Sequence, residues 1–133
     1  NIGADSNNSN LKNNYAEVRL WDYSIGHYRK TGLQFCGLIM ADHVKCGINT
    51  MFNTGTTVGV GANVFGPGFP DNFVPDFTWG GPQGMEVYRL DKMLDTAAKV
   101  VARREHRGFD NDDRKILETI FNLTDGYRAG RTA

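Results

Sequence analysis

The 133-residue chain has little cysteine, no excess of either charge and no long apolar run. Two cysteines are too few for a disulfide framework. Fifteen basic and fifteen acidic side chains cancel, so no net field attracts nucleic acid or an anionic membrane. No apolar stretch reaches membrane-spanning length, and no signal peptide opens the chain. These absences predict a cytoplasmic protein of one domain, with neither nucleic acid nor membrane as a partner.

What the chain does have is a six-residue repeat between Met40 and Gly68. The first position of each hexad is apolar, and the fifth is small or β-branched. The first positions are Met40, Cys46, Phe52, Val58 and Val64, and the fifth positions are Val44, Thr50, Thr56, Ala62 and Gly68. Helices and alternating strands have other periods, whereas three hexads close one coil of a parallel β-helix. The repeat therefore predicts a parallel β-helix with both positions facing inward. A β-meander with coincidental spacing is the alternative.

The second position of the repeat favours glycine and asparagine, as at Gly47, Asn53 and Gly59. Both residue types adopt left-handed backbone angles at low cost. We therefore expect the chain to turn with positive φ at this position. An earlier unit, residues 2–6, follows the same pattern. Because the chain opens inside a hexad at Asn1, we expect it to be the C-terminal part of a longer protein.

Residues 16–32 lose the repeat and alternate in the manner of two strands around a turn. Residues 18–21 and 27–30 are the alternating runs, and residues 24–26 supply the turn. This pattern predicts a β-hairpin that projects from the coils. Loops on a rigid scaffold often carry ligand contacts, although a solvated hairpin with packed aromatics is the alternative. The basic candidates for such contacts are Arg19, His27, Arg29 and Lys30.

The rest of the chain divides into a segment rich in glycine, proline and aromatics, residues 66–83, and a helical part, residues 84–133. The first predicts a stiff irregular run whose aromatics pack on the coils or on a neighbouring subunit. In the second, an apolar stripe over residues 87–101 indicates one helix, and Asp110 caps another. We expect these helices to cover the open C-terminal end of the coils. The predicted fold is mainly β, with coils over residues 1–83.

Signals for catalysis or metal binding are weak. Cys46 lies at an inward position, where a free thiol behaves as a small apolar group. His43 lies at a corner, where we expect it to be solvated. The glycine-rich residues 55–61 lack the Lys-Ser/Thr ending and the helix of a P-loop, which excludes that nucleotide site. The acidic residues around Asp110 compensate a helix dipole, and without close histidine or cysteine pairs we predict no metal site.

Several strings of the sequence resemble one known family. They are Asn1-Ile2-Gly3-Ala4, Leu11-Lys12-Asn13-Asn14-Tyr15, the hexads from Met40 with residues 47–55 among them, and Phe77-Thr78-Trp79-Gly80-Gly81. In these strings the chain is similar to the left-handed β-helix acetyltransferases with hexapeptide repeats. More narrowly, it resembles the C-terminal part of the bifunctional enzymes that make UDP-N-acetylglucosamine, including an alternate bacterial form of sugar nucleotidyltransferase.

The resemblance implies a left-handed parallel β-helix that assembles as a homotrimer, with active sites between the subunits. The implied reaction transfers acetyl from acetyl-CoA to the amine of glucosamine-1-phosphate, with a histidine as general base. Magnesium is implied only for a nucleotidyltransferase domain, which this chain does not contain. The family's catalytic histidine lies before Asn1. We therefore expect the chain to hold no catalytic residue and to be inactive alone.

The resemblance also implies roles for single residues. Asn1 and Tyr15 match contacts to the amino sugar, and Arg19 lies near a lysine that binds the sugar phosphate. Ile48 departs from the pattern, because a small hydroxyl residue normally faces the coenzyme there. The positions that match contacts to acetyl-CoA are Ala4, Asn14, Tyr15 and Gly66.

Two other functions stay open on the sequence. A non-catalytic β-helix would serve as a scaffold that trimerises a sugar nucleotidyltransferase. A β-helix of the γ-carbonic anhydrase kind would bind zinc through histidines of two subunits, but the three histidines here stand in no repeating relation. Acetyl-CoA binding separates the scaffold from the enzyme, and a metal analysis tests the anhydrase.

Overall fold

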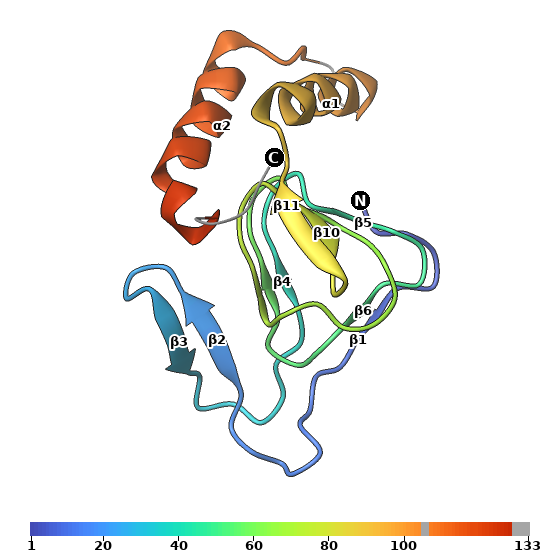
Figure 1. The fold of residues 1–133 in the computed structure, drawn as a ribbon, viewed down its shortest axis with the longest axis vertical. Helices are drawn as coiled ribbons and strands as arrows, with labels where there is room; N and C mark the ends of the chain where they lie inside the picture. The colour runs from blue at the N-terminus through green and yellow to red at the C-terminus, as the bar shows by residue number, and fades with distance from the viewer. Residues whose placement is uncertain (105–106, 129–133) are drawn as a thin grey trace.

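The computed structural model describes residues 1–104 and 107–128, which form several small β-sheets and two α-helices (Figure 1). The short strands are β1 (Asn7–Asn8), β4 (Ile39–Met40), β5 (Lys45–Cys46), β6 (Met51–Phe52), β7 (Thr57–Val58), β8 (Asn63–Val64) and β9 (Phe73–Val74). The longer strands are β2 (Arg19–Asp22), β3 (His27–Lys30), β10 (Thr78–Gly81) and β11 (Gly84–Val87). The helices are α1 (Leu90–Arg104), α2 (Asn111–Leu123) and the 3-10 helix η1 (Asp125–Arg128). The predicted order of strands followed by helices is confirmed.

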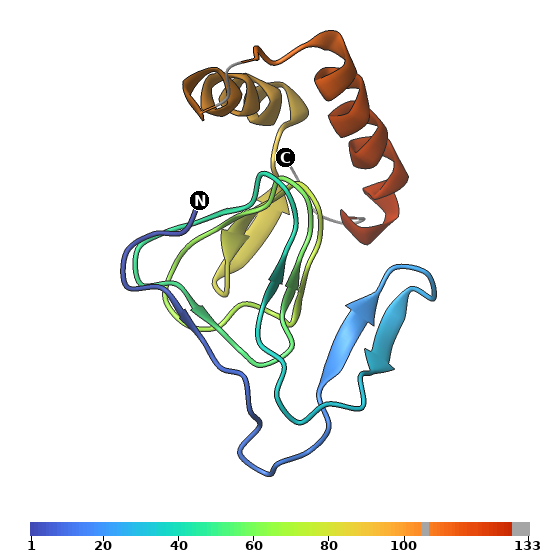
Figure 2. The same ribbon diagram turned by 180° about the vertical axis from the view of Figure 1, so that it is seen from behind.

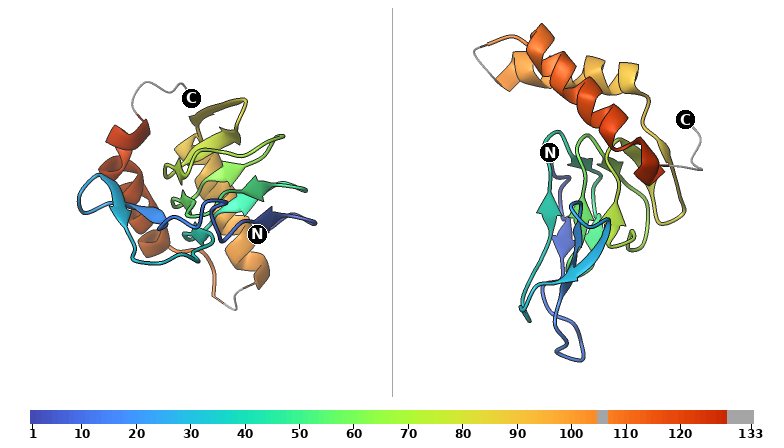
Figure 3. Two further views of the ribbon diagram at one scale, coloured as in Figure 1. Left: turned by 90° about the horizontal axis from the view of Figure 1, so that it is seen from below. Right: turned by 90° about the vertical axis from the view of Figure 1, so that its left-hand side faces the viewer.

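Parallel pairing stacks the short strands in layers. β5, β8 and β10 belong to one sheet, β4, β7 and β9 form a second, and β1 pairs with β6 in a third. Ile39 pairs with Thr57 and Lys45 with Asn63, in each case a residue three hexads further along the chain. Figure 1 shows the chain running round a triangular outline, and the left view of Figure 3 shows the layers side by side. The sheets are separate, and none closes on itself.

The first positions of the repeat share a common interior. Phe52, Val58 and Val64 are each about 1% exposed and belong to one buried cluster, as the repeat predicts. Fully burying a side chain of this size contributes about 1.5–3 kcal/mol, so this cluster is a main source of stability. The cluster also contains Val44, Cys46, Ala62 and Val74.

Threonine at the fifth position is buried with its hydroxyl satisfied. Thr50 and Thr56 are at most 2% exposed, and each donates a 2.8 Å hydrogen bond to the carbonyl oxygen three residues earlier. Ser6 makes the same bond to Gly3, also at 2.8 Å. A buried hydroxyl without a partner costs about 1–3 kcal/mol. The local bond therefore explains why a small hydroxyl residue is accepted in this interior.

Positive φ angles occur at the fourth position of the repeat, which corrects the prediction made for the second. The small second-position residues are required by the close approach of neighbouring layers. A Cβ on Gly59 would lie 2.5 Å from the amide nitrogen of Asp76, and one on Gly3 would overlap the backbone of Gly47. The fourth-position residues with φ between 61° and 75° are Asp5, His43, Asn49, Gly55 and Gly61.

The predicted hairpin is confirmed as the antiparallel pair of β2 and β3, which leaves the stack after β1 and returns before β4. An antiparallel bridge between Leu11 and Phe35 closes its base. The hairpin lies against the stack, because the Trp21 ring stacks on the Phe73 ring with centroids 4.1 Å apart. Its Trp21 ring also meets Tyr28 edge-on.

Residues 66–83 are not the irregular run that their composition predicts. They contain β9 and β10, which extend two of the parallel sheets. Val74 pairs with Val58 and Gly80 with Val64, so the interior continues for another layer. β11 then pairs antiparallel with β10, which places Val87 in a strand rather than in the predicted helix.

The two helices pack along the side of the layers and not over their C-terminal end as expected. Figures 1 and 2 show both helices outside the triangular outline, and the right view of Figure 3 shows α1 crossing the stack. Met93 and Leu117 join Phe77 in a second buried cluster, which holds α1 and α2 against the corners. The predicted cap of α2 is confirmed, because Asp110 and Asp113 form a reciprocal capping box. No helix in the described ranges has the length and apolarity needed to cross a membrane.

Candidate functional site

One corner of the stack carries three of the residues singled out by sequence. Ala4, Ile48 and Gly66 all hold the third position of a hexad, one in each of three successive layers. The layers meet closely here, since the Asn49 amide donates a 2.9 Å hydrogen bond to the Ala4 carbonyl oxygen. We call Ala4, Ile48 and Gly66 the corner ridge.

The corner ridge is open to solvent. Ile48 is 73% exposed, and Ala4 and Gly66 are also exposed. Gly66 has φ of +104°, and a Cβ built on it would meet no atom within 4 Å. Glycine is therefore required at this position by its backbone angle, and the space beside it is free for another molecule.

The remaining predicted residues lie outside the ridge, at three places in the chain. Asn1 begins the first layer, where its amino group donates a 2.9 Å hydrogen bond to the Val44 carbonyl oxygen. Asn14 and Tyr15 lie in the loop between β1 and β2, at the end of the molecule opposite the N-terminus (Figures 1 and 2). Arg19 is exposed on β2. A single chain thus does not bring the predicted sugar contacts together.

The loop between β1 and β2 presents its aromatic residue to solvent. Tyr15 is 66% exposed with φ of 58°, and its carbonyl oxygen accepts a 3.3 Å hydrogen bond from Gln34. The Asn14 side chain accepts a 3.0 Å hydrogen bond from the Ala16 amide, which shapes the turn. An exposed aromatic residue on a fixed turn is suited to contact a second molecule.

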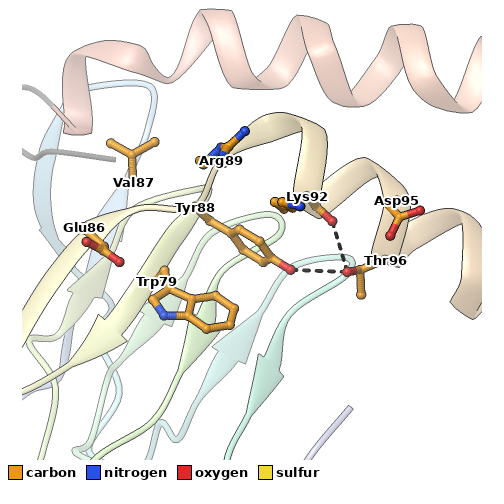
Figure 4. A pocket seen from close by; sticks show the side chains of 8 residues that line it. All are labelled: Trp79, Glu86, Val87, Tyr88, Arg89, Lys92, Asp95 and Thr96. Carbon is orange, nitrogen blue, oxygen red and sulfur yellow. Dashed lines mark hydrogen bonds between the residues drawn. The ribbon is translucent and has the colours of Figure 1, made fainter.

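A separate cleft of about 370 Å³ lies between β10, β11 and the start of α1 (Figure 4). Trp79 and Tyr88 form its apolar floor, with ring centroids 4.8 Å apart and nearly perpendicular planes. The Tyr88 hydroxyl lies 3.4 Å from that of Thr96, which donates a 3.0 Å hydrogen bond to the Lys92 carbonyl oxygen. Its other lining residues are Glu86, Val87, Arg89 and Asp95.

This cleft is amphipathic, because it combines two aromatic rings with the charged side chains of Glu86, Lys92 and Asp95. Arg89 is already paired with Asp91, 2.8 Å away. The sequence did not indicate the cleft, because Val87 fits a helical stripe as well as a strand. The available signal was the Gly80–Gly84 run, whose terminal glycines have φ of +136° and +154° and form a hairpin turn.

The hairpin tyrosines are unsuited to act as bases. Burial, and then the hydrogen bond to the Asp76 carboxylate, raise the pKa of Tyr23 well above its usual value. That hydrogen bond is 2.6 Å long, and the same carboxylate accepts a 2.7 Å bond from the Val60 amide. Burial also raises the pKa of Tyr28. Tyr23 therefore stays protonated near neutral pH and ties the hairpin to the stack through Asp76, whereas Tyr28 packs on Trp21 within the hairpin.

The two histidines that precede the helices occupy different surroundings. His27 is exposed in β3. His43 is half-buried beneath the helices, and burial, followed by the charge of Lys45, lowers its pKa. In residues 1–104 and 107–128, no three His, Cys, Asp or Glu side chains gather to hold a metal ion. Both cysteines are free, with Cys46 buried as predicted.

Comparison with known proteins gives no family for this chain. No protein-family model matches it, and a search of curated proteins finds no match. The functional argument therefore depends on the residues and on their arrangement alone.

Proposed function

We propose that this chain is the acetyltransferase part of a sugar-nucleotide enzyme, built on a left-handed parallel β-helix. In this proposal it assembles as a homotrimer and binds acetyl-CoA and glucosamine-1-phosphate between subunits. The observation that supports it best is the pairing of strands three hexads apart around one apolar interior. The resemblance of the strings around Asn1, Tyr15 and Gly47 supplies the chemistry.

The positions of the proposed ligand contacts suit a site shared between copies of the chain. The corner ridge and the Tyr15 loop are both exposed yet lie apart in one chain. A site between subunits would place the loop of one copy against the ridge of the next. The small residues Ala4 and Gly66 leave room along the ridge for an extended ligand, whereas Ile48 projects into that path.

Calorimetric titration of acetyl-CoA into the chain tests this proposal. Saturable binding is expected, and Ile48→Ser should strengthen it about two- to tenfold, because a hydroxyl adds a hydrogen bond where an apolar side chain now obstructs. Tyr15→Ala should weaken it. Ile116→Ser and Leu123→Ala are matched controls, since these α2 residues are 58% and 77% exposed. The proposal would be overturned if neither Ile48→Ser nor Tyr15→Ala changed the affinity for acetyl-CoA.

Transfer itself is expected to need a histidine that this chain does not supply at the matching position. Incubation with acetyl-CoA and glucosamine-1-phosphate should therefore release no free thiol above the uncatalysed rate. Thiol release by the chain alone would contradict this assignment of roles.

A second function, a non-catalytic scaffold for trimerisation, is favoured by the apolar side chains exposed on the stack. Ile2, Ile39 and Ile48 are 63%, 48% and 73% exposed. Contact with another copy would bury such side chains. Light scattering and acetyl-CoA titration separate the two functions. A trimer that binds no acetyl-CoA is the scaffold, and a trimer that binds it is the enzyme part.

A further inference from the structure

A second cavity lies between the first corner of the stack and the C-terminal end of α1. Its volume is about 320 Å³. Lys45 reaches it from β5, and Arg104 reaches it as the last residue of α1. His43 and Asp42 line it from the corner, and Val100 adds an apolar wall from α1. Two parts of the chain that are distant in sequence, the corner with β5 and the end of α1, thus bring basic side chains to one hollow.

The backbone fixes the basic side of this cavity. His43 holds a positive φ of 61°, which turns the chain sharply just before β5. The Lys45 ammonium group then donates a 3.3 Å hydrogen bond to the His43 carbonyl oxygen, which holds it at the cavity. The parallel pairing of Lys45 with Asn63 also fixes the backbone from which this side chain extends.

Lys45 and Arg104 supply the positively charged side chains of this cavity. Within the described part of the chain, neither Lys45 nor Arg104 forms an ion pair. Asp42 lines the cavity but is not within ion-pair distance of either. The position of Arg104 is explained by the C-terminal end of α1, because the partial negative charge of a helix C-terminus attracts cations. It does not account for Lys45, which comes from a strand.

The electrostatics of the group agree with the geometry. Burial, and then the charge of Arg104, lower the pKa of Lys45. Burial and the charge of Lys45 also lower the pKa of His43, against the opposing charges of Asp42 and Asp113. Like charges that the fold holds close together are stabilised when an anion binds between them.

We propose that the cavity formed by His43, Lys45 and Arg104 binds a phosphate group. A phosphate offers several strong acceptor oxygens to the ammonium, guanidinium and imidazole groups, and the volume suits a small phosphorylated molecule. This site is separate from the corner ridge and does not depend on acetyl transfer. The phosphate belongs either to a sugar phosphate or to the nucleotide end of a coenzyme.

Titrations in low-salt buffer test the site. The probes are inorganic phosphate, glucose-1-phosphate and adenosine 3′,5′-bisphosphate, with glucose as the phosphate-free control. All three phosphates should bind in competition, and the tightest identifies the source. Lys45→Gln should weaken binding about fivefold and Lys45→Gln with Arg104→Gln at least about thirtyfold, with further weakening as salt rises.

Matched controls separate the cavity from general surface charge. Lys99→Gln and Arg114→Gln remove exposed cations from α1 and α2, and both should leave affinity unchanged. Thermal melting establishes that each variant is folded.

Two results would overturn the site. One is the lack of saturable binding of any phosphate up to about 10 mM, a limit weaker than ordinary ligand affinity. The other is binding that the folded double variant retains. Binding of glucose with an affinity like that of the phosphates would likewise refute recognition of the phosphate group.

Discussion

Two consecutive parts of the stack reach the same architecture from very different sequences. Residues 40–64 repeat so regularly that their interior can be assigned by counting in sixes. Residues 66–81 show no repeat, yet β9 and β10 pair in parallel with β7 and β8. Val74 and Gly80 are again one hexad apart, and each lies opposite a first-position residue. The stack requires register at its strands, and the connections between them are free to vary.

The difference lies in how each part satisfies its corners. In the regular part, local hydroxyl bonds close the turns that end at Thr50 and Thr56. In the continuation, the buried Asp76 carboxylate does this through long-range bonds to Tyr23 and Val60. The Thr78 hydroxyl still donates a 2.6 Å hydrogen bond to the Pro75 carbonyl oxygen. The continuation thus keeps the local hydroxyl bond that Thr50 and Thr56 make in the regular part.

The largest expected effect tests whether the irregular part carries as much of the core as the regular one. Phe52→Ala and Phe77→Ala should each destabilise the fold by about 3–5 kcal/mol, because both rings are at most 1% exposed. Urea unfolding measures the change. Phe69→Ala, which truncates a ring 48% exposed, is the control and should cost far less. A small effect for Phe77→Ala would show that only the repeating part holds the core.

The next effect concerns the boundary between the two parts, where layers meet at Gly59. Gly59→Ala should cost up to about 3 kcal/mol, because its Cβ would lie 2.5 Å from the backbone of Asp76. Gly108→Ala is the control, since a Cβ there meets no atom within 4 Å. If both alanines prove equally mild by urea unfolding, close packing does not explain the second position of the repeat.

A smaller effect should follow from releasing the hairpin from the continuation. Tyr23→Phe removes the 2.6 Å hydrogen bond to Asp76 and should cost about 1.5 kcal/mol, near the lower end for a charged acceptor. Tyr28→Phe on the same hairpin should be close to neutral. Proteolysis within residues 19–30 should speed up only in the first variant. If both variants resisted proteolysis equally well, ring stacking alone would hold the hairpin on the stack.

The smallest expected effect is the pH dependence that His43 adds to the regular part. Burial and Lys45 lower its pKa below the ordinary 6.5, against the opposing charges of Asp42 and Asp113. Between the lowered value and 6.5 the unfolded chain binds a proton that the folded chain does not, so stability falls as pH drops through this window. His43→Gln should flatten the fall in urea midpoint between about pH 7.5 and 5.5. An unchanged slope would exclude His43 as its source.

Local patterns predicted much of this fold, and long-range contacts account for what they missed. The repeat identified the interior of Phe52, Val58 and Val64, and the capping residues identified the start of α2. The extension through β9 and β10 depends on pairing with distant strands, which no window around Pro70 contains. The side-on placement of α1 depends likewise on its contacts with Phe77 and the corners.

The candidate sites also divide into one that the sequence indicated and others that only the structure reveals. The resemblance selected Ala4 and Gly66, and the structure aligns them with Ile48 on one ridge. Neither the Trp79–Tyr88 cleft nor the basic cavity was visible in the sequence. The cleft depends on Val87 lying in a strand rather than in the predicted helix, and the cavity joins a corner to the distant end of α1. Lys45 and Arg104 become neighbours only when α1 crosses the layers.

Because β4 and β5 each pair with a strand three hexads further along the chain, the regular part can change length only in certain steps. Deleting one hexad would move every later first-position residue to the adjacent side of the triangle and mismatch all parallel pairs beyond it. Deleting three hexads would shorten the stack by one layer and keep the remaining parallel pairs in register. The spacing between Val64 and Val74 is shorter than two hexads, yet Val74 still pairs with Val58. This connection is therefore the place where the rule of whole hexads does not apply.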